Sequence, residues 1–174
     1  VLSDLTLPDK LLPMAEESAI IPGLICFAVP ETAVMSNVQV AADILTRLRI
    51  KGFKISMDDF GTGYSSLKEL YRMPFSEVKI DKSFILNALS DQEAWIVARA
   101  MIELGHNLGQ IVVAEGVESL ELLHKLAGAK CDLAQGYFIA KPMNAEQYDS
   151  WMKENTKENI FLKWKEEFPL RPEK

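Results

Sequence analysis

The sequence predicts an α/β fold of about five parallel strands with helices on the outside. Its 174 residues, of which 48% are hydrophobic, are enough for one domain with a sizeable core. Apolar runs of strand length alternate with amphipathic segments of helix length along the chain. Four of the apolar runs end at polar side chains, a pattern typical of the carboxyl-terminal rim of a parallel β/α barrel.

The first third of the chain predicts a helix, a strand and a second helix. Residues 7–19 are helix-like, although Pro13 should weaken or kink the helix. The continuous apolar run at residues 23–29 is typical of a buried strand, and it stops at a Pro-Glu pair. Residues 36–52 carry apolar side chains on one stripe and end at Gly52, as amphipathic helices do.

The rest of the chain continues this alternation. The predicted strands are residues 53–57, 76–80, 110–115 and 131–136. The predicted helices are residues 65–73, 90–109, 119–129 and 144–155. Two of these helices carry capping signals, because Ser90 has a glutamate three residues later and Asn144 has a glutamine. The charged stretch 156–174 is predicted to be a tail, either a short helix outside the barrel or a mobile end.

The stretch "KISMDDFGTGYSSL", residues 54–67, organises the rest of the chain. A strand ends there in two adjacent carboxylates, Asp58 and Asp59, before a turn with two glycines. Neighbouring side chains on a strand point to opposite faces, so two carboxylates can share a cation only where the backbone turns. The glycines are expected to supply that turn. The alternative is an acidic strand end followed by a solvated loop, because acidic turns are common.

Three later stretches also bring polar side chains to strand ends. "EVKID" has Lys79 between two apolar residues, so its side chain faces away from them. "IVVAEGVES" runs into Glu115 and then Glu118, and "AQGYFIAKP" has Gln135 at the end of a short apolar run. In a parallel barrel these side chains would gather at one rim, where Lys79 would point into an acidic site.

Four blocks of the sequence resemble the signature blocks of the EAL domain in residue identity and in order. They are "DDFGTGYSSL", "VKIDKSFI", "VVAEGVES" and "QGYFIAKPM". That family comprises bacterial phosphodiesterases that hydrolyse cyclic di-GMP to linear pGpG with Mg2+ or Mn2+. The resemblance implies an incomplete (β/α)8 barrel of the TIM type, with residues 1–155 forming a partial EAL domain. By this resemblance the chain lacks about three strands at its beginning.

The resemblance implies a role for each residue at the rim. Asp58 and Asp59 match the paired aspartates that hold two metal ions in the family. Lys79 matches the lysine that contacts the attacking water. Glu115 matches a glutamate proposed as general base or metal ligand.

Other matches identify residues that support the site and a position where a metal ligand is missing. Glu118 and Gln135 match residues that support the site and help to orient the water. The "ExTE" block of the family falls on "AVPE", so Ala28 stands where the family has a metal-binding glutamate. Glu31 matches the second glutamate of that block, which braces the loop after the aspartate pair. The "EAL" glutamate and an asparagine ligand would lie before the first residue of this sequence.

These losses predict a weakened metal site. Two-metal hydrolysis of a phosphodiester needs a water that both ions activate, and Mg2+ binds weakly to only one or two carboxylates. We therefore expect weak Mg2+ or Mn2+ binding and little activity. Three functions stay open: a phosphodiesterase that upstream sequence or a partner chain completes, a degenerate module that binds cyclic di-GMP or acts through protein contacts, and a remnant without function.

Bulk properties limit the partners. The net charge of −6 argues against a broad basic surface for nucleic acid and suits a carboxylate site. The sequence contains no run of about 20 apolar residues, so it predicts no membrane segment. Cys26 and Cys131 are predicted to be small buried hydrophobes, and a cytoplasmic location is expected. Open strand edges are a hazard, so we expect a homodimer or association with another chain, whether this sequence is a fragment or a short variant.

Overall fold

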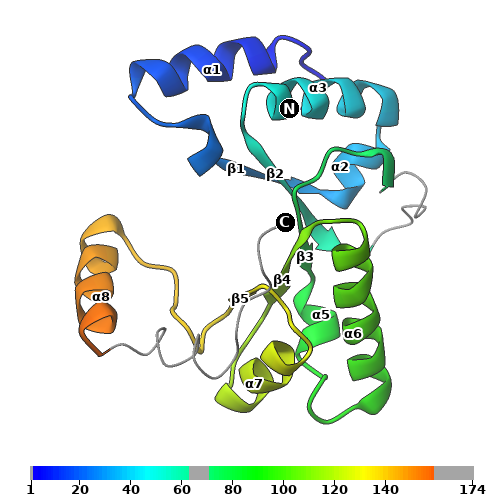
Figure 1. Ribbon diagram of the computed structural model, residues 1–174, viewed down its shortest axis with the longest axis vertical. Helices are drawn as coiled ribbons and strands as arrows, with labels where there is room; N and C mark the ends of the chain where they lie inside the picture. Colours follow the sequence, from blue (N-terminus) through cyan, green and yellow to red (C-terminus); the bar gives the residue numbers. More distant parts are fainter. Residues whose placement is uncertain (1, 63–70, 159–174) are drawn as a thin grey trace.

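The computed structural model describes residues 2–62 and 71–158, which form an open five-stranded sheet with helices against it (Figure 1). The strands are β1 (Cys26–Pro30), β2 (Lys54–Phe60), β3 (Glu77–Ile80), β4 (Ile111–Glu115) and β5 (Leu133–Gln135). They pair in sequence order, and every pair is parallel. The prediction of about five parallel strands is confirmed. The sheet is not closed, and β1 and β5 are its edges.

Helices precede, connect and follow the strands. In the described part of the chain the α-helices are α1 (Leu7–Glu17), α2 (Glu31–Met35), α3 (Val38–Ile50), α5 (Lys82–Ile85), α6 (Gln92–Asn107), α7 (Leu120–Gly128) and α8 (Ala145–Glu158). The short α2 and α5 were not predicted, because four or five residues are too few to show a helical period. Most of the helix predicted at residues 65–73 lies outside the described residues, as does most of the predicted tail.

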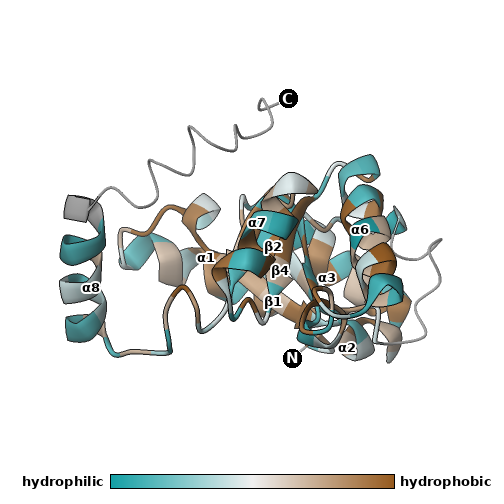
Figure 2. Ribbon diagram, turned by 90° about the horizontal axis from the view of Figure 1, so that it is seen from below, coloured by the Kyte–Doolittle hydropathy of each residue, from teal (hydrophilic) through white to brown (hydrophobic). Residues whose placement is uncertain are grey.

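The two faces of the sheet have different surroundings. Alternation along the strands and their register put one set of side chains toward the helices, which we call the covered face. This face includes Ile55, Val78, Ile80, Val112 and Ala114, all 0% exposed. Figure 2 shows hydrophobic segments in the strands and on the adjoining helices, whereas α8 is mainly hydrophilic and stands apart.

The opposite set of side chains forms what we call the open face. On it lie, among others, Ala28, Ser56, Asp58, Lys79, Glu115 and Gln135. Two of its apolar side chains are substantially exposed, Ile111 at 39% and Leu133 at 50%. Cys26 is also exposed on this face, so the prediction that it is buried was wrong. Cys131 is partly buried, and burial raises the pKa of its thiol to about 12.

Two details of the helices differ from the sequence prediction. Helix α6 is capped by Asp91 rather than Ser90, because the Asp91 Oδ1 accepts hydrogen bonds from the backbone of Glu93 and Ala94. The Ser90 hydroxyl instead donates to the Asn87 carbonyl oxygen. The predicted reciprocal cap at the start of α8 is confirmed, with Asn144 and Gln147 exchanging two bonds of 2.9 and 3.0 Å.

No helix in the described ranges is both long enough and apolar enough to cross a bilayer.

Candidate metal centre

A bulge near the end of β2 brings two adjacent aspartates to one place. The register between β2 and β3 shifts between Met57 and Phe60, and Asp59 has a φ of +56°. This left-handed backbone is uncommon outside glycine, although Asp tolerates it better than most residues. The expected turn is therefore made within the strand by Asp59 itself, before Gly61, whose φ is +96°. The bulge ends the strict alternation that would send the two carboxylates to opposite faces.

Three carboxylates meet at this end of the sheet. Asp58 and Asp59 come from β2 and Glu115 from the last position of β4, and each offers an oxygen within 4.8 Å of the others. Asp58 and Glu115 are partly buried, whereas Asp59 is exposed. Carboxylate oxygens are the ligands that Mg2+ and Mn2+ prefer, so this donor set fits a hard divalent cation. Parallel strands end at one edge, which is why residues far apart in the sequence converge there.

Lys79 from β3 lies between two of the carboxylates. Its Nζ donates to Asp58 Oδ1 at 3.0 Å and is 2.5 Å from Glu115 Oε1. Burial alone lowers the pKa of Lys79. The hydrogen bonds and negative charges of Glu115 and Asp58 outweigh burial and raise this pKa above its ordinary value. The lysine is therefore charged at neutral pH, and the cluster of three carboxylates and one ammonium has a net charge of about −2.

Glu31 connects the start of α2 to the chain that follows the aspartate pair. Its side chain is 2% exposed, and its Oε2 accepts a hydrogen bond of 3.2 Å from the Gly61 backbone. A side chain at Gly61 would meet Met101 at 2.5 Å and Phe84 at 3.1 Å. The backbone at Gly61 is thus confined between a buried carboxylate and the helices below it.

Ala28 and Ser56 are neighbours on the open face. They are register partners on β1 and β2, and Ser56 is two residues before Asp58 on the same face. Ala28 offers only a methyl group toward the cluster. Ser56 is 1% exposed, and its Oγ has no hydrogen-bond partner among the residues that the structure describes. Sequence reasoning missed Ser56, although its spacing of two from Asp58 was a signal that it shares that face.

The two predicted supporting residues differ in position. Gln135 is the register partner of Glu115, so it lies beside the cluster on the edge strand β5. Glu118 is exposed and does not belong to the group of converging carboxylates. The segments after β4 and β5 are in backbone contact, since Val117 N donates to Gln135 O at 3.0 Å. A side chain at Gly136 would lie 2.1 Å from the Val117 carbonyl oxygen.

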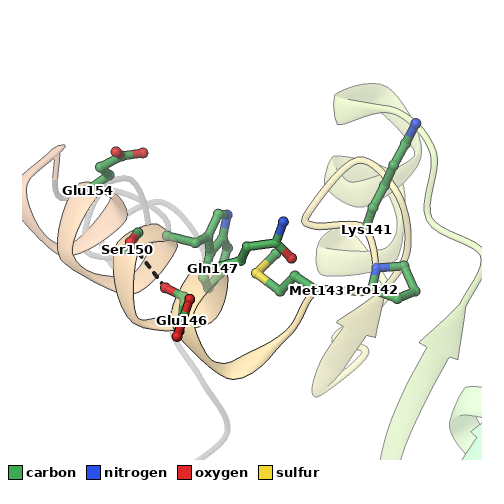
Figure 3. Close-up of a pocket in the computed structure, with 8 residues that line it drawn as sticks. Lys141, Pro142, Met143, Glu146, Gln147, Ser150 and Glu154 are labelled. Atoms are coloured by element: carbon green, nitrogen blue, oxygen red, sulfur yellow. Dashed lines mark hydrogen bonds between the residues drawn. The ribbon is translucent and has the colours of Figure 1, made fainter.

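A concavity separate from the carboxylate cluster lies beside α8. Figure 3 shows that the segment Lys141, Pro142 and Met143 forms one side of it and that Gln147 and neighbouring α8 residues form the other. It shares no residue with the carboxylate cluster. It contains none of the residues predicted for the site.

The fold and the cluster define a class: a parallel α/β domain with an acidic site at the carboxyl ends of its strands. The family model of the EAL domain matches residues 2–142, which is more than half of the chain. This chain belongs to the EAL domain family.

Relatives and solved structures agree with that membership. The chain is 35% identical to the cyclic di-GMP phosphodiesterase NbdA of Pseudomonas aeruginosa over 148 residues, which is 85% of this chain and 19% of NbdA. It is also similar to the PaMucR phosphodiesterase in its c-di-GMP complex. Identity is 35%, the TM-score is 0.79, and the match covers 84% of this chain and 60% of that one.

A structure that contains a metal is also similar. Klebsiella pneumoniae BlrP1, in a manganese and cy-diGMP complex, matches with 29% identity and a TM-score of 0.72, over 77% of this chain and 34% of that one. These likenesses confirm the predicted fold class. The chain spans only 17–19% of the length of three of its curated relatives, so the functions of those whole proteins are not transferred with the fold.

Proposed function

We propose that this chain is a cyclic di-GMP signalling domain that binds the nucleotide with the help of Mg2+ or Mn2+ but hydrolyses it little or not at all. Membership of the EAL family, and relatives whose names include cyclic di-GMP, support this nucleotide as the ligand. The observation that carries the lack of hydrolysis is Ala28, a methyl group beside Ser56 where the family resemblance implies a metal-binding glutamate.

Each residue of the cluster has a proposed part in binding. Asp58, Asp59 and Glu115 would hold the cation, which would supply Lewis acidity and positive charge for a phosphate. Lys79 would fix the positions of Asp58 and Glu115 through its two contacts. Because a cluster with a net charge of about −2 repels a phosphodiester, binding of the nucleotide should depend on the cation.

Three other residues would act as supports. Glu31 would hold the chain after the aspartate pair in place by accepting the hydrogen bond of Gly61. Gln135, beside Glu115, would face the nucleotide from β5. Glu118 is exposed, so we propose that it contacts the nucleotide rather than the cation.

A calorimetric titration of the full chain with cyclic di-GMP tests this proposal. We expect binding in Mn2+ and at least about tenfold weaker binding in EDTA. Asp59→Asn, which removes an exposed ligand without changing the volume of the side chain, should weaken binding in Mn2+. Absence of binding in Mn2+ would contradict the proposal and favour a degenerate module that acts through protein contacts.

The open face favours a second candidate, an active phosphodiesterase that is completed by further strands. The strands β1 and β5 are unpaired edges among the described residues, and the open face exposes Ile111 and Leu133. A second copy, another chain or upstream sequence could cover these edges and add ligands. Turnover that increases with protein concentration would support completion by a second copy in a cytoplasmic homodimer. Turnover at a constant rate per chain would exclude that route.

A further inference from the structure

We infer that the concavity beside α8 is a docking groove for a segment of the same chain, residues 169–172, whose sequence is Pro-Leu-Arg-Pro. The concavity is called the α8 groove below, and the four residues are called the PLRP segment. The inference goes beyond the proposed function and uses no residue of the carboxylate cluster. It rests on the lining of the groove, its charges, and the length of chain that follows α8.

The lining of the α8 groove suits an extended peptide. The groove has a volume of about 570 Å³ and lies between residues 141–143 and one side of α8 (Figure 3). Its apolar side chains are Pro142, Met143 and Trp151. The Trp151 ring is partly buried and stacks on Tyr148, with 6.1 Å between the ring centroids. Grooves with aromatic side chains are the usual docking sites of proline-rich segments.

Helix α8 also has apolar surface without cover. Figure 2 shows that it stands apart from the helices on the sheet. Tyr148 and Met152 on α8 are 50% and 40% exposed. A helix of 14 residues is marginally stable in water without a packing partner. A segment that docks in the α8 groove would bury apolar surface of Trp151 and stabilise the helix.

The PLRP segment has the spacing that such a groove recognises. Pro169 and Pro172 are three residues apart. A polyproline II helix has three residues per turn, so both proline rings would lie on one edge, against Trp151 and Pro142, and Arg171 on another. Prolines already favour this conformation, so little conformational entropy would be lost on docking.

The charges of the groove and of the segment are complementary. Glu146 and Glu154 line the groove from α8, and Lys141 lines it from the opposite side. A chain that turns back at the end of α8 runs antiparallel to the helix. Arg171 would then approach the two glutamates, and Glu173, two residues further on, would come closer to Lys141. Opposite charges would therefore meet at both places.

The length of chain after α8 allows the segment to reach its own groove. The described residues end at Glu158, the last residue of α8, and ten residues, 159–168, separate it from the PLRP segment. Ten extended residues span up to about 33 Å, whereas the 14 residues of α8 are about 21 Å long. A short connection also gives an effective concentration of about millimolar, which favours the groove of the same chain over that of a second copy.

Fluorine NMR of the full chain, labelled with 5-fluorotryptophan, tests the inference. The chain has three tryptophans, so Trp151 is assigned by the loss of one signal in Trp151→Phe. Changing Pro169 and Pro172 together to alanine should move the Trp151 signal by more than its linewidth, because the groove loses its occupant. The signal of Trp95, on α6, should stay in place.

Charge reversal sharpens the test. Arg171→Glu should move the Trp151 signal in the same direction, and adding Glu154→Lys should restore most of it, because the two charges are then exchanged. Lys165→Glu is the matched control, since it reverses a charge of the same sign within residues 159–168, and we expect no movement.

Four results would overturn the inference. They are an unmoved Trp151 signal in the double proline variant, an equal movement in Lys165→Glu, no restoration by Glu154→Lys, and a wild-type signal that depends on protein concentration. The last result would assign the groove to the segment of a second copy. The test uses neither nucleotide nor metal, so its outcome is independent of the proposed function.

Discussion

The two faces of the sheet are built from the same five strands but depend on different interactions. The covered face is apolar and largely buried against helices, with Ile55, Val78 and Ile80 all inaccessible to solvent. The open face carries the cluster of three carboxylates with Lys79, and two of its apolar side chains, Ile111 and Leu133, remain 39% and 50% exposed. Stability should therefore come mainly from the covered face, and the chemistry from the open face.

The largest effect should come from matched truncations on the two faces. Ile80→Ala on the covered face should lower the free energy of unfolding by about 2–5 kcal/mol, because it leaves a cavity. Ile111→Ala, on the open face of the adjacent strand, should cost less than about 1 kcal/mol. Urea denaturation followed by circular dichroism measures both. Equal costs would break the comparison and show that something covers the open face in solution.

A second pair of variants tests the rim where the open face ends. Gly136→Ala should cost about 3 kcal/mol, since its methyl group would collide with the backbone of Val117. Gly128→Ala, at the last position of α7, has no atom within 4 Å of the added methyl group and should be neutral or stabilising. Thermal unfolding distinguishes them. A tolerated Gly136→Ala would mean that the rim is not rigid.

Charge balance on the open face gives a smaller effect. Lys79→Met should destabilise the metal-free chain by about 2 kcal/mol, because Asp58 and Glu115 lose their shared partner. Mn2+ should restore part of this loss. Chemical denaturation in EDTA and in Mn2+ provides the comparison. A variant as stable as the wild type in EDTA would show that the lysine does not balance the cluster.

The same lysine predicts a pH dependence. Its pKa is raised in the folded state, so its contribution to stability is complete below the ordinary lysine value of 10.5. That contribution is lost as the pH rises through the folded-state value. The difference in stability between wild type and Lys79→Met should thus stay constant from pH 7 to 9 and shrink above about pH 10.5.

The smallest effect concerns α6, which helps to bury the covered face. Asp91→Ala should cost about 1 kcal/mol, because two backbone amide groups lose their acceptor. Ser90→Ala should change the free energy of unfolding by much less, since its hydroxyl only contacts an exposed carbonyl. Thermal melts of the two variants measure the difference. A larger loss of stability in Ser90→Ala than in Asp91→Ala would show that Ser90 is the cap.

The covered face was predictable from the sequence because burial leaves a regular pattern. Apolar runs such as residues 110–115 and the stripe of the 36–52 helix gave the strands, the helices and their order. The exposure of Cys26 was not predictable, because an apolar residue in a strand gives no sign of whether its face will be covered. Short α2 and α5 also left no periodic signal.

The candidate site was only partly predictable. The types and spacing of Asp58, Asp59, Lys79 and Glu115 pointed to one acidic rim, and the structure does bring these four together. The backbone conformation that brings the two aspartates together was not predictable from the sequence. The left-handed backbone of Asp59 and the shifted register depend on how β2 pairs with β3. The isolation of the Ser56 hydroxyl likewise depends on which residue stands opposite it on β1.

The most direct test of the whole account is turnover. Purified wild-type chain and the Asp59→Asn variant are incubated with cyclic di-GMP and Mn2+, and pGpG is followed by chromatography. The account predicts that the wild type releases no more pGpG than Asp59→Asn, because Ala28 leaves the site without a ligand that hydrolysis needs. Release of pGpG by the wild type but not by Asp59→Asn would contradict it and show that the open face already holds a working phosphodiesterase site.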